Sequence, residues 1–348
     1  MYKNCHILLH GLCFFPFDIV SCCYAPNDHI NGCKPPVLFE NYHGELFSKE
    51  ELFSKIRKYS DFFKQGNCPK ECEGCFQIKE ADWDEGEYID FMTITQFSKC
   101  NADCIYCSNN LNPTERTHET YDIVPLLHHF KQLGIIKDNC ELHIGGGEFT
   151  IYKECEQIIE EFGFDNYKIY IPTNAIHYSE KIHNAMQHGS TFIIVSLDSG
   201  CRKTYKKIKR VDTFDKVVKN LYKYKDNIKT KITLKYIIIP GINDNLKEYK
   251  KFLKIAKELG AIVRIDIDAR YLRKEKNIIN PLYISLAKKM YKITERIGID
   301  VEFYSFLQQG IHQSTNRKYT IKDIWNYIEL KYLKKYEKTL YTDYKYDK

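Results

Sequence analysis

The sequence predicts an α/β fold in which a parallel sheet forms a closed or partial barrel, preceded by a small cysteine-rich module. From about residue 90 onward, short apolar runs alternate with stretches of helical periodicity. About six or seven such units follow one another, which fits a barrel better than half of a doubly wound sheet. Eleven of the 14 cysteines lie in the first 107 residues, and residues 1–88 lack the alternation. We therefore expect a module at 1–88, a barrel at 89–305 and a helical Lys/Tyr-rich extension at 306–348.

The strands of the barrel are predicted where β-branched and aromatic residues form short apolar runs. The helices are predicted where apolar residues recur at helical spacing. The predicted strands span residues 91–97, 141–145, 167–171, 191–197, 232–239, 261–267 and 300–304. The predicted helices span residues 121–132, 154–162, 179–187, 213–224, 246–259, 284–297 and 321–335, with a further helix at 49–63 in the module.

The composition is that of an ordinary globular protein. The chain has 348 residues, of which 43% are hydrophobic and 28% charged, and this excludes a disordered chain, a collagen-like fibre and a coiled-coil rod. No apolar run approaches the roughly 20 residues of a membrane span. The apolar stretch 7–20 is interrupted by His10, Pro16 and Asp18 and does not resemble a signal peptide. We expect a cytoplasmic protein without a membrane partner.

The net charge of +6 is mild, although lysines are concentrated in the last third. A nucleic-acid partner would call for a denser basic patch or a known binding module, so a solvated helix face explains these lysines better. A zinc-binding nucleic-acid protein without enzymatic activity is kept as a distant alternative.

Cysteines in a reducing compartment usually serve metals or catalysis, because thiols there do not persist as disulfides. The sharpest pattern is CNADCIYC, with Cys100, Cys104 and Cys107 directly after a predicted strand. Three cysteines at this spacing can hold one iron–sulfur cluster and leave one iron open to a small molecule. A zinc site is the competing interpretation and would need a fourth ligand, such as His118.

Polar and glycine-rich motifs follow the ends of other predicted strands, where α/β proteins bind their ligands. The segment IGGGEFT (144–150) offers close backbone approach and the carboxylate of Glu148, which suits an ammonium group. Ser196, Asp198 and Ser199 suit ribose hydroxyls, and the segment IPGIND (239–244) is a tight turn. Each motif alone is weak, since an aspartate after a strand is often only a helix cap. Their occurrence at successive strand ends predicts a common ligand site.

This arrangement resembles the radical S-adenosylmethionine (radical SAM) enzymes over roughly residues 88–305. The resemblance implies a partial (β/α)6 TIM-like barrel, a [4Fe–4S] cluster held by Cys100, Cys104 and Cys107, and S-adenosylmethionine (SAM) bound beside it. Lys235 is a weaker candidate for the methionine carboxylate. The resemblance assigns the other SAM contacts to Tyr106 beside the adenine, Gly146, Gly147 and Glu148 at the methionine amino group, Ser196 and Asp198 at the ribose, and the turn containing Ile239 and Gly241.

A second cysteine triad, Cys68, Cys72 and Cys75 in CPKECEGC, repeats the spacing of the first but follows a predicted helix. With the stretch 13–33 it resembles a SPASM-type auxiliary-cluster module, placed before the barrel instead of after it. The resemblance implies a second iron–sulfur cluster, whereas a structural zinc site is the alternative. The candidate ligands are Cys13, Cys22, Cys23, Cys68, Cys72 and Cys75.

The resemblance implies reductive cleavage of SAM and hydrogen abstraction from a peptide, protein, sugar or lipid precursor. It also implies a small electron donor such as flavodoxin or ferredoxin. The auxiliary cluster could accept an electron, bind the substrate or be structural. Cys201 directly follows SLDSG and is a candidate hydrogen donor, although a small buried residue is the more common role of such a cysteine. A tRNA-modifying radical SAM enzyme is the alternative function.

Overall fold

A computed structural model describes residues 2–22, 36–68, 72, 78–81, 86–107, 120–268 and 281–303. The chain forms two compact units. The first comprises Met1–Asn101, Asn109–Ile194 and Lys223–Thr230, and the second comprises Ala102–Ser108, Val195–Tyr222 and Lys231–Lys348. The segment that carries Cys100, Cys104 and Cys107 therefore contributes its first part to one unit and its second part to the other.

The first unit is built on a mostly parallel sheet. Its strand order is β4-β3-β2-β6-β7-β8, with parallel pairing from β2 to β8 and antiparallel pairing of β3 with its two neighbours. The strands are β2 (Gly11–Phe14), β3 (Ile19–Val20), β4 (Val37–Phe39), β6 (Ile89–Ile94), β7 (Ile136–Ile144) and β8 (Lys168–Thr173). A separate two-stranded ribbon pairs β1 (Tyr2–Asn4) with β5 (Lys79–Ala81).

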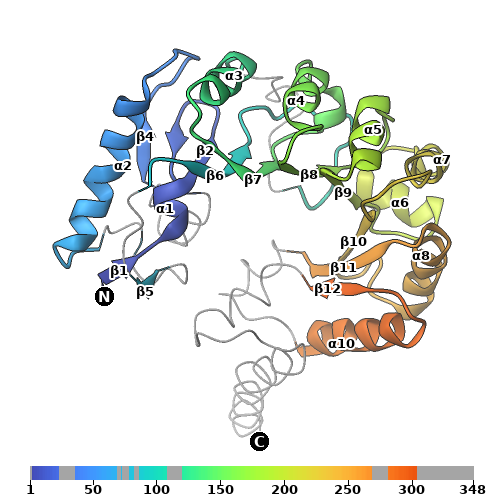
Figure 1. Cartoon of the computed structure of the whole chain (residues 1–348). Helices are drawn as coiled ribbons and strands as arrows, with labels where there is room; N and C mark the ends of the chain where they lie inside the picture. Colours follow the sequence, from blue (N-terminus) through green and yellow to red (C-terminus); the bar gives the residue numbers. More distant parts are fainter. Residues whose placement is uncertain are drawn as a thin grey trace, which may run out of the picture. The chain divides into compact units, whose positions relative to one another are not determined.

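Helices of the first unit cover this sheet with their apolar faces. Ser48 caps α2 by accepting a hydrogen bond from Glu51 N, and Ser179 caps α5 in the same way from Ile182 N. Leu142 and Ile169 of the sheet and Phe130 of α3 are fully buried. Figure 1 shows α3, α4 and α5 following one another along this sheet. The helices are α1 (His6–His10), α2 (Lys49–Lys64), α3 (Val124–Gln132), α4 (Cys155–Phe162) and α5 (Glu180–His188), with the short 3-10 helix η3 (Phe149–Ile151).

The second unit repeats the same design with a parallel sheet. Its strands β10 (Thr233–Ile238), β11 (Ile262–Ile267) and β12 (Val301–Phe303) pair in that order. Asn245 caps α8 by accepting from Glu248 N, and Gly260 ends α8 in the left-handed conformation (φ 65°). The helices are α6 (Arg202–Lys209), most of α7 (Phe214–Tyr224), α8 (Leu246–Leu259) and α10 (Pro281–Arg296). The strand β9 (Thr191–Ser196) begins in the first unit, and its last two residues belong to the second.

The α/β fold class with mostly parallel strands is confirmed. Each predicted strand from 91–97 to 300–304 coincides with one of the strands β6 to β12, and α8 has the predicted bounds. The sequence did not predict α6, α1 or the strands β1 to β5. The predicted helix 321–335 and the extension 306–348 lie outside the described residues.

Residues on both sides of position 88 share one sheet, because Leu12 of β2 pairs in register with Met92 of β6. The separate module at 1–88 and its boundary remain predictions. Within the described ranges, no helix is both long and apolar enough to cross a membrane.

Candidate active site

The glycines Gly146 and Gly147 hold the segment that leads into Cys100. Gly147 N donates to Phe97 O (3.0 Å), and the next amide, Glu148 N, donates to Lys99 O (2.8 Å). A Cβ atom on Gly146 would lie 2.1 Å from Phe97 O, and one on Gly147 would lie 2.1 Å from Lys99 O. Only glycine allows the two backbones to come this close. The glycine pair at the end of β7 therefore fixes the path of the chain into Cys100.

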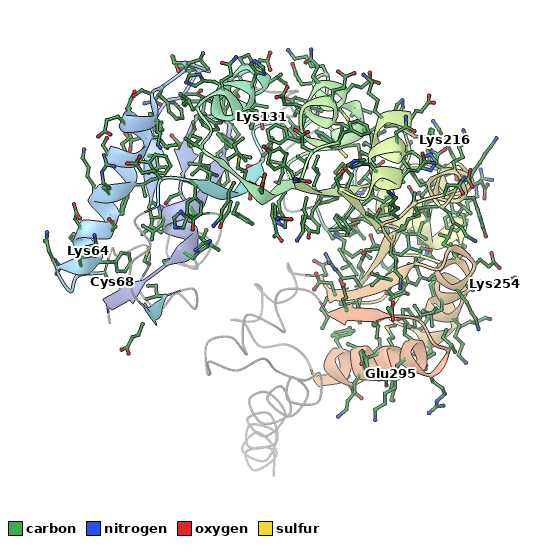
Figure 2. All side chains as sticks on the ribbon, in the orientation of Figure 1. Lys64, Cys68, Lys131, Lys216, Lys254 and Glu295 are labelled. Carbon is green, nitrogen blue, oxygen red and sulfur yellow. The ribbon has the colours of Figure 1, made fainter. Side chains whose placement is uncertain are left out.

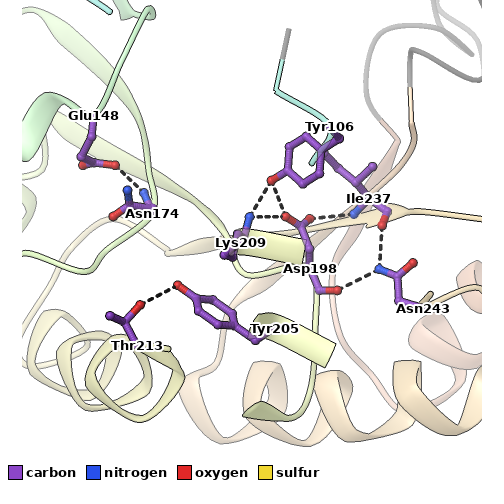
Figure 3. A network of polar contacts seen from close by, with 9 residues as sticks. All are labelled: Tyr106, Glu148, Asn174, Asp198, Tyr205, Lys209, Thr213, Ile237 and Asn243. Atoms are coloured by element: carbon purple, nitrogen blue, oxygen red, sulfur yellow. Dashed lines mark hydrogen bonds and ion pairs between the residues drawn. The ribbon is translucent and has the colours of Figure 1, made fainter. Parts of the chain in front are cut away.

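Glu148 is buried and accepts hydrogen bonds on both carboxylate oxygens. Its Oε1 accepts from Thr150 N (3.2 Å), Thr150 Oγ1 (2.7 Å) and Thr173 Oγ1 (2.5 Å). Its Oε2 accepts from Asn174 N (2.7 Å), as Figure 3 shows. These donors fix the orientation of the carboxylate at the ends of β7 and β8, because a buried carboxylate needs such partners. The side chain of Glu148 is therefore held in place without a ligand, as the sequence interpretation requires for binding an ammonium.

Asn174 connects Glu148 to the turn at Cys100. Its side-chain amide donates to Asn101 Oδ1 (2.6 Å) and approaches Cys100 Sγ at 3.8 Å. Sequence reasoning missed Thr173 and Asn174, although polar residues directly after a predicted strand are the same kind of signal that singled out Asp198.

The second part of the cysteine segment is attached to the C-terminal end of α6. Asp103 N donates to Lys209 O (3.1 Å) and Ile105 N donates to Ile208 O (2.9 Å), so the residues on both sides of Cys104 are held. The last carbonyls of a helix have no partner within the helix, and these two amides provide one. The Arg210 side chain adds an exposed ion pair with Asp103 (3.1 Å). The end of α6 is thus a docking point for Cys104.

Tyr106, Asp198 and Lys209 form a buried polar cluster (Figure 3). The Tyr106 hydroxyl donates to Asp198 Oδ2 (2.5 Å), and Lys209 Nζ donates both to that oxygen (2.5 Å) and to the Tyr106 hydroxyl (2.5 Å). Lys209 and Asp198 are both 0% exposed. Burial alone would lower the pKa of Lys209, but the negative charges of Asp198 and Cys104 raise it to about 12. Lys209 therefore remains an ammonium, and the cluster contains a paired cation and anion.

Burial and the neighbouring Asp198 raise the pKa of Tyr106 well above its ordinary value, so Tyr106 remains a neutral hydroxyl donor. Its ring packs against an apolar cluster of Ile208, Ile237 and Ile239. The predicted adenine contact is thus fixed at the hydroxyl by charged partners and at the ring by isoleucines.

Asp198 also joins the ends of β9 and β10. Its Oδ1 accepts from Ile237 N (2.8 Å), and its carbonyl accepts from Asn243 Nδ2 (2.8 Å). Asn243 is fully buried, and its Oδ1 accepts from Ile239 N (2.7 Å). Asp198 itself has a left-handed backbone (φ 57°), which is uncommon for a residue with a side chain. The Asp198 carboxylate, which the resemblance assigns to the ribose, therefore already accepts three hydrogen bonds from the protein.

The remaining predicted SAM contacts lie around these groups. Ser196 is the partly exposed last residue of β9, and Lys235 is a partly exposed residue of β10 whose pKa is lowered by burial. Ile239 is buried, whereas Gly241 is exposed and has a positive φ of 74°. The SAM-binding roles of these residues remain predictions.

Cys100, Cys104 and Cys107 are partly exposed thiols. In the part of the chain that the structure describes, no group of three or more His, Cys, Asp or Glu side chains is arranged to hold a metal ion. The local structure nevertheless fits cluster ligands, because soft thiolates are the ligands of iron–sulfur clusters and backbone hydrogen bonds hold both parts of this segment. The ligand roles of the three cysteines remain predictions.

The auxiliary-cluster candidates lie in different surroundings. Cys13 is a fully buried residue of β2, and Cys22 is also buried. Cys68 and Cys72 instead pack on an apolar cluster of Cys5, Leu8 and Phe63. Figure 2 shows Cys68 just beyond the end of α2, close to Lys64 in the view. Cys23, Cys75 and the alternative zinc ligand His118 lie outside the described residues.

Cys201, the candidate hydrogen donor, lies against α8. Its Sγ donates to Glu248 Oε2 (3.4 Å), and the other oxygen of that buried carboxylate accepts from Ser199 Oγ (2.7 Å) and Gly200 N (3.0 Å). A Cβ atom on Gly200 would lie 2.2 Å from Phe252 N, so this turn is packed tightly on the helix. The structure thus surrounds the Cys201 thiol with protein partners.

Comparison with known proteins identifies the domain that these motifs form. Residues 94–256 match the family model of the Radical SAM superfamily. This segment is a radical SAM domain. It contains Cys100, Gly146, Asp198 and Lys209, so the geometry described above belongs to the core of a radical SAM enzyme.

The radical SAM chain has curated relatives of known activity. It is 24% identical over 223 residues to a GTP 3′,8-cyclase of Clostridium botulinum. The aligned segment covers 62% of this chain and 68% of the relative. It is 28% identical over 185 residues to a GTP 3′,8-cyclase of Listeria welshimeri, which covers 51% of this chain and 54% of the relative. The chain therefore matches only part of either relative.

Among solved structures, SuiB of Streptococcus suis bound to its precursor peptide SuiA matches with a TM-score of 0.50 at 13% identity. The match covers 77% of this chain and 56% of SuiB. At this identity the likeness shows a shared fold and nothing about the substrate.

Proposed function

We propose that this radical SAM enzyme cleaves SAM reductively and abstracts a hydrogen atom from a substrate carbon. The observation that carries the proposal is the attachment of the CX3CX2C segment by backbone hydrogen bonds in both its parts. Gly147 and Glu148 hold the residues before Cys100, and the end of α6 holds the residues around Cys104. A [4Fe–4S] cluster, when bound, supplies one electron that breaks a carbon–sulfur bond of SAM and yields a 5′-deoxyadenosyl radical.

The side chains of the site divide the recognition of SAM among them. Glu148 offers to the amino group its Oε2 oxygen, which accepts a hydrogen bond from Asn174 N, and Lys235 offers a cation to the carboxylate group. Tyr106, Ile239 and the turn at Gly241 flank the adenine. Ser196 contacts the ribose, and Asp198 acts chiefly by holding Tyr106 beside the adenine, since its own oxygens already accept three hydrogen bonds.

We further propose that the enzyme carries an auxiliary iron–sulfur cluster with Cys68 and Cys72 among its ligands. These two residues lie together on the apolar cluster that contains Cys5, which makes Cys5 a better candidate for a third ligand than the fully buried Cys13. An acceptor cluster would make the reaction a net oxidation, and a small flavodoxin or ferredoxin would supply the electron for SAM cleavage.

The test is anaerobic reconstitution followed by counting iron and sulfide and assaying 5′-deoxyadenosine after adding dithionite and SAM. About eight irons per chain in the wild type and about four in the Cys100/Cys104/Cys107→Ala variant would support two clusters. Only the wild type should form 5′-deoxyadenosine. Cys140→Ala, which removes a buried thiol from β7, is the matched control and should retain both properties. Zinc without iron, and no 5′-deoxyadenosine, would contradict the proposal in favour of a zinc-binding protein.

A guanosine nucleotide is the second candidate substrate class, favoured by the similarity to GTP 3′,8-cyclases. Lys235 and Arg264 are register partners on β10 and β11, and the Arg264 guanidinium pairs with Glu302 (2.8 Å). An arginine of this kind can also bind a phosphate group. Incubating the reconstituted enzyme with SAM and GTP should then give a cyclised nucleotide detectable by mass spectrometry. Peptide, sugar, lipid-precursor and tRNA substrates form the other arms of the same assay.

A further inference from the structure

In the buried cluster of Tyr106, Asp198 and Lys209, Lys209 contacts the cysteine segment with both its backbone and its side chain. Its carbonyl accepts from Asp103 N, the residue before Cys104, and its ammonium donates to Tyr106, two residues after Cys104. Its Nζ lies 4.8 Å from the centre of the Tyr106 ring. Residues on both sides of Cys104 therefore contact the buried Lys209.

The buried carboxylate of Asp198 balances the charge of Lys209. Lys209 Nζ lies 2.5 Å from Asp198 Oδ2, and neither side chain is exposed to solvent. A charge removed from water acts on its neighbours over a longer range than a surface charge, because little solvent screens it. Removing either partner would leave an uncompensated charge close to Cys104.

The reduction potential of an iron–sulfur cluster depends on nearby charge, hydrogen bonding and burial. A negative charge near the cluster makes it harder to reduce, and a positive charge makes it easier to reduce. The neutral Lys209–Asp198 pair holds Tyr106 in place and adds no net charge to these surroundings.

We propose that Lys209 is a positioning residue of the SAM cluster, and that its pairing with Asp198 prevents an unpaired buried charge from shifting the reduction potential of that cluster. This inference rests on the proposed function, because it requires a cluster at Cys100, Cys104 and Cys107. Lys209 and Asp198 act through their fixed opposite charges, and neither takes part in proton transfer.

The experiment measures the midpoint potential of the SAM cluster by anaerobic redox titration, followed by electron paramagnetic resonance. The SAM-cluster signal is identified by its change when SAM is added. Lys209→Met should shift the potential downward, because the Asp198 carboxylate loses its counter-ion. Asp198→Asn should shift it upward, because the Lys209 ammonium loses its counter-ion. The double variant Asp198→Asn/Lys209→Met should return toward the wild-type value.

The opposite signs separate an electrostatic role from damage to the fold. Loosening the segment would move both single variants in the same direction, and the double variant further still, so that result would overturn the inference. Unchanged potentials in both single variants would also overturn it. Because one unpaired buried charge can prevent folding, the double variant and the charge-preserving Lys209→Arg provide independent readings. Lys209→Arg should stay close to the wild type.

The matched control removes a positive charge from the opposite end of the same helix. Arg202 begins α6, and its exposed guanidinium pairs with Asp212 (2.7 Å). Arg202→Gln should leave the midpoint potential unchanged, since solvent screens an exposed pair. A wild-type enzyme without a SAM-responsive cluster would refute the proposed function itself. A normal wild-type cluster with unshifted variants would refute the role of Lys209 alone.

Discussion

The hydroxyl of Tyr106 donates a 2.5 Å hydrogen bond to Oδ2 of Asp198, a residue 92 positions later in the chain. This bond joins the segment after Cys104 to the end of β9. The same oxygen accepts from Lys209, so the three groups depend on one another.

Tyr106→Phe removes this donor and leaves Asp198 and Lys209 one partner short. Leaving a buried polar group without a partner costs about 1–3 kcal/mol, and we expect the free energy of unfolding to fall by that amount. Anaerobic urea unfolding, followed by circular dichroism, checks this. Tyr222→Phe is the control, because the hydroxyl of Tyr222 bonds to Glu258 on the exposed surface. Equal losses in the two variants would show that the buried network adds nothing.

Gly146→Ala should disrupt the cluster segment without a large effect on the rest of the fold. The added Cβ would lie 2.1 Å from Phe97 O, so the backbone before Cys100 must move. We expect 5′-deoxyadenosine formation to fall by at least about tenfold, which corresponds to 1.4 kcal/mol in the barrier. Gly260→Ala has a similar positive φ (65°) but nothing within 4 Å of the new Cβ, and should retain activity. If Gly146→Ala and Gly260→Ala had equal activity, the close approach of Gly146 to Phe97 O would not be the cause of any loss of activity.

Asp266 should make stability depend on pH around neutrality. Burial raises the pKa of this β11 carboxyl to about 7, so the folded state binds a proton that the unfolded state releases at lower pH. The associated stability is complete at low pH and is lost as pH rises through about 7, with a slope of at most about 1.4 kcal/mol per pH unit. Asp266→Asn should therefore gain stability relative to the wild type between pH 6 and pH 8, measured by anaerobic denaturant unfolding. Asp300→Asn, which changes an exposed carboxylate, is the control. A constant difference at both pH values would contradict the raised pKa.

Cys72→Ser should remove the auxiliary cluster, whereas Cys13→Ala should not. Cys72 packs with Cys68 on the Cys5 cluster, while Cys13 is fully buried within β2, where its side chain serves packing. Iron analysis after reconstitution should show a loss of about four irons in Cys72→Ser. Cys13→Ala should keep its iron and lose thermal stability. The reverse pattern would assign Cys13 to the cluster and Cys72 to packing.

Local patterns predicted the barrel strands and most of its helices, because their apolar residues follow the strand and helix periods. The strand β7 begins five residues earlier than predicted. Residues 136–140 (IKDNC) are largely exposed and carry no apolar pattern, and the pairing of Ile136 with Ile89 extends the strand there. This extension depends on a partner that the local sequence does not show.

Helix α6 and its last residue could not be found in this way. The sequence of α6, RKTYKKIK, is mostly basic, and Tyr205, Ile208 and Lys209 alone are buried. A lysine is almost never fully buried unless it is paired. The partner of Lys209, Asp198, is distant enough in sequence that only the fold brings them together. Asp198 could therefore be singled out from a sequence motif. Lys209, whose charge balances that of Asp198, could not.

Position 198 must meet two conflicting requirements, one from its left-handed backbone and one from the partners of its side chain. The main chain alone would be served best by glycine, which adopts φ 57° without steric cost. The buried ammonium of Lys209 and the hydroxyl of Tyr106 require a carboxylate there. Asp198→Gly would relax the backbone but leave the Lys209 ammonium without its counter-ion. Asp198→Glu would keep the charge but lengthen the side chain in a filled space. Aspartate is the compromise that serves both, because a left-handed backbone at one residue costs less free energy than an unpaired buried cation.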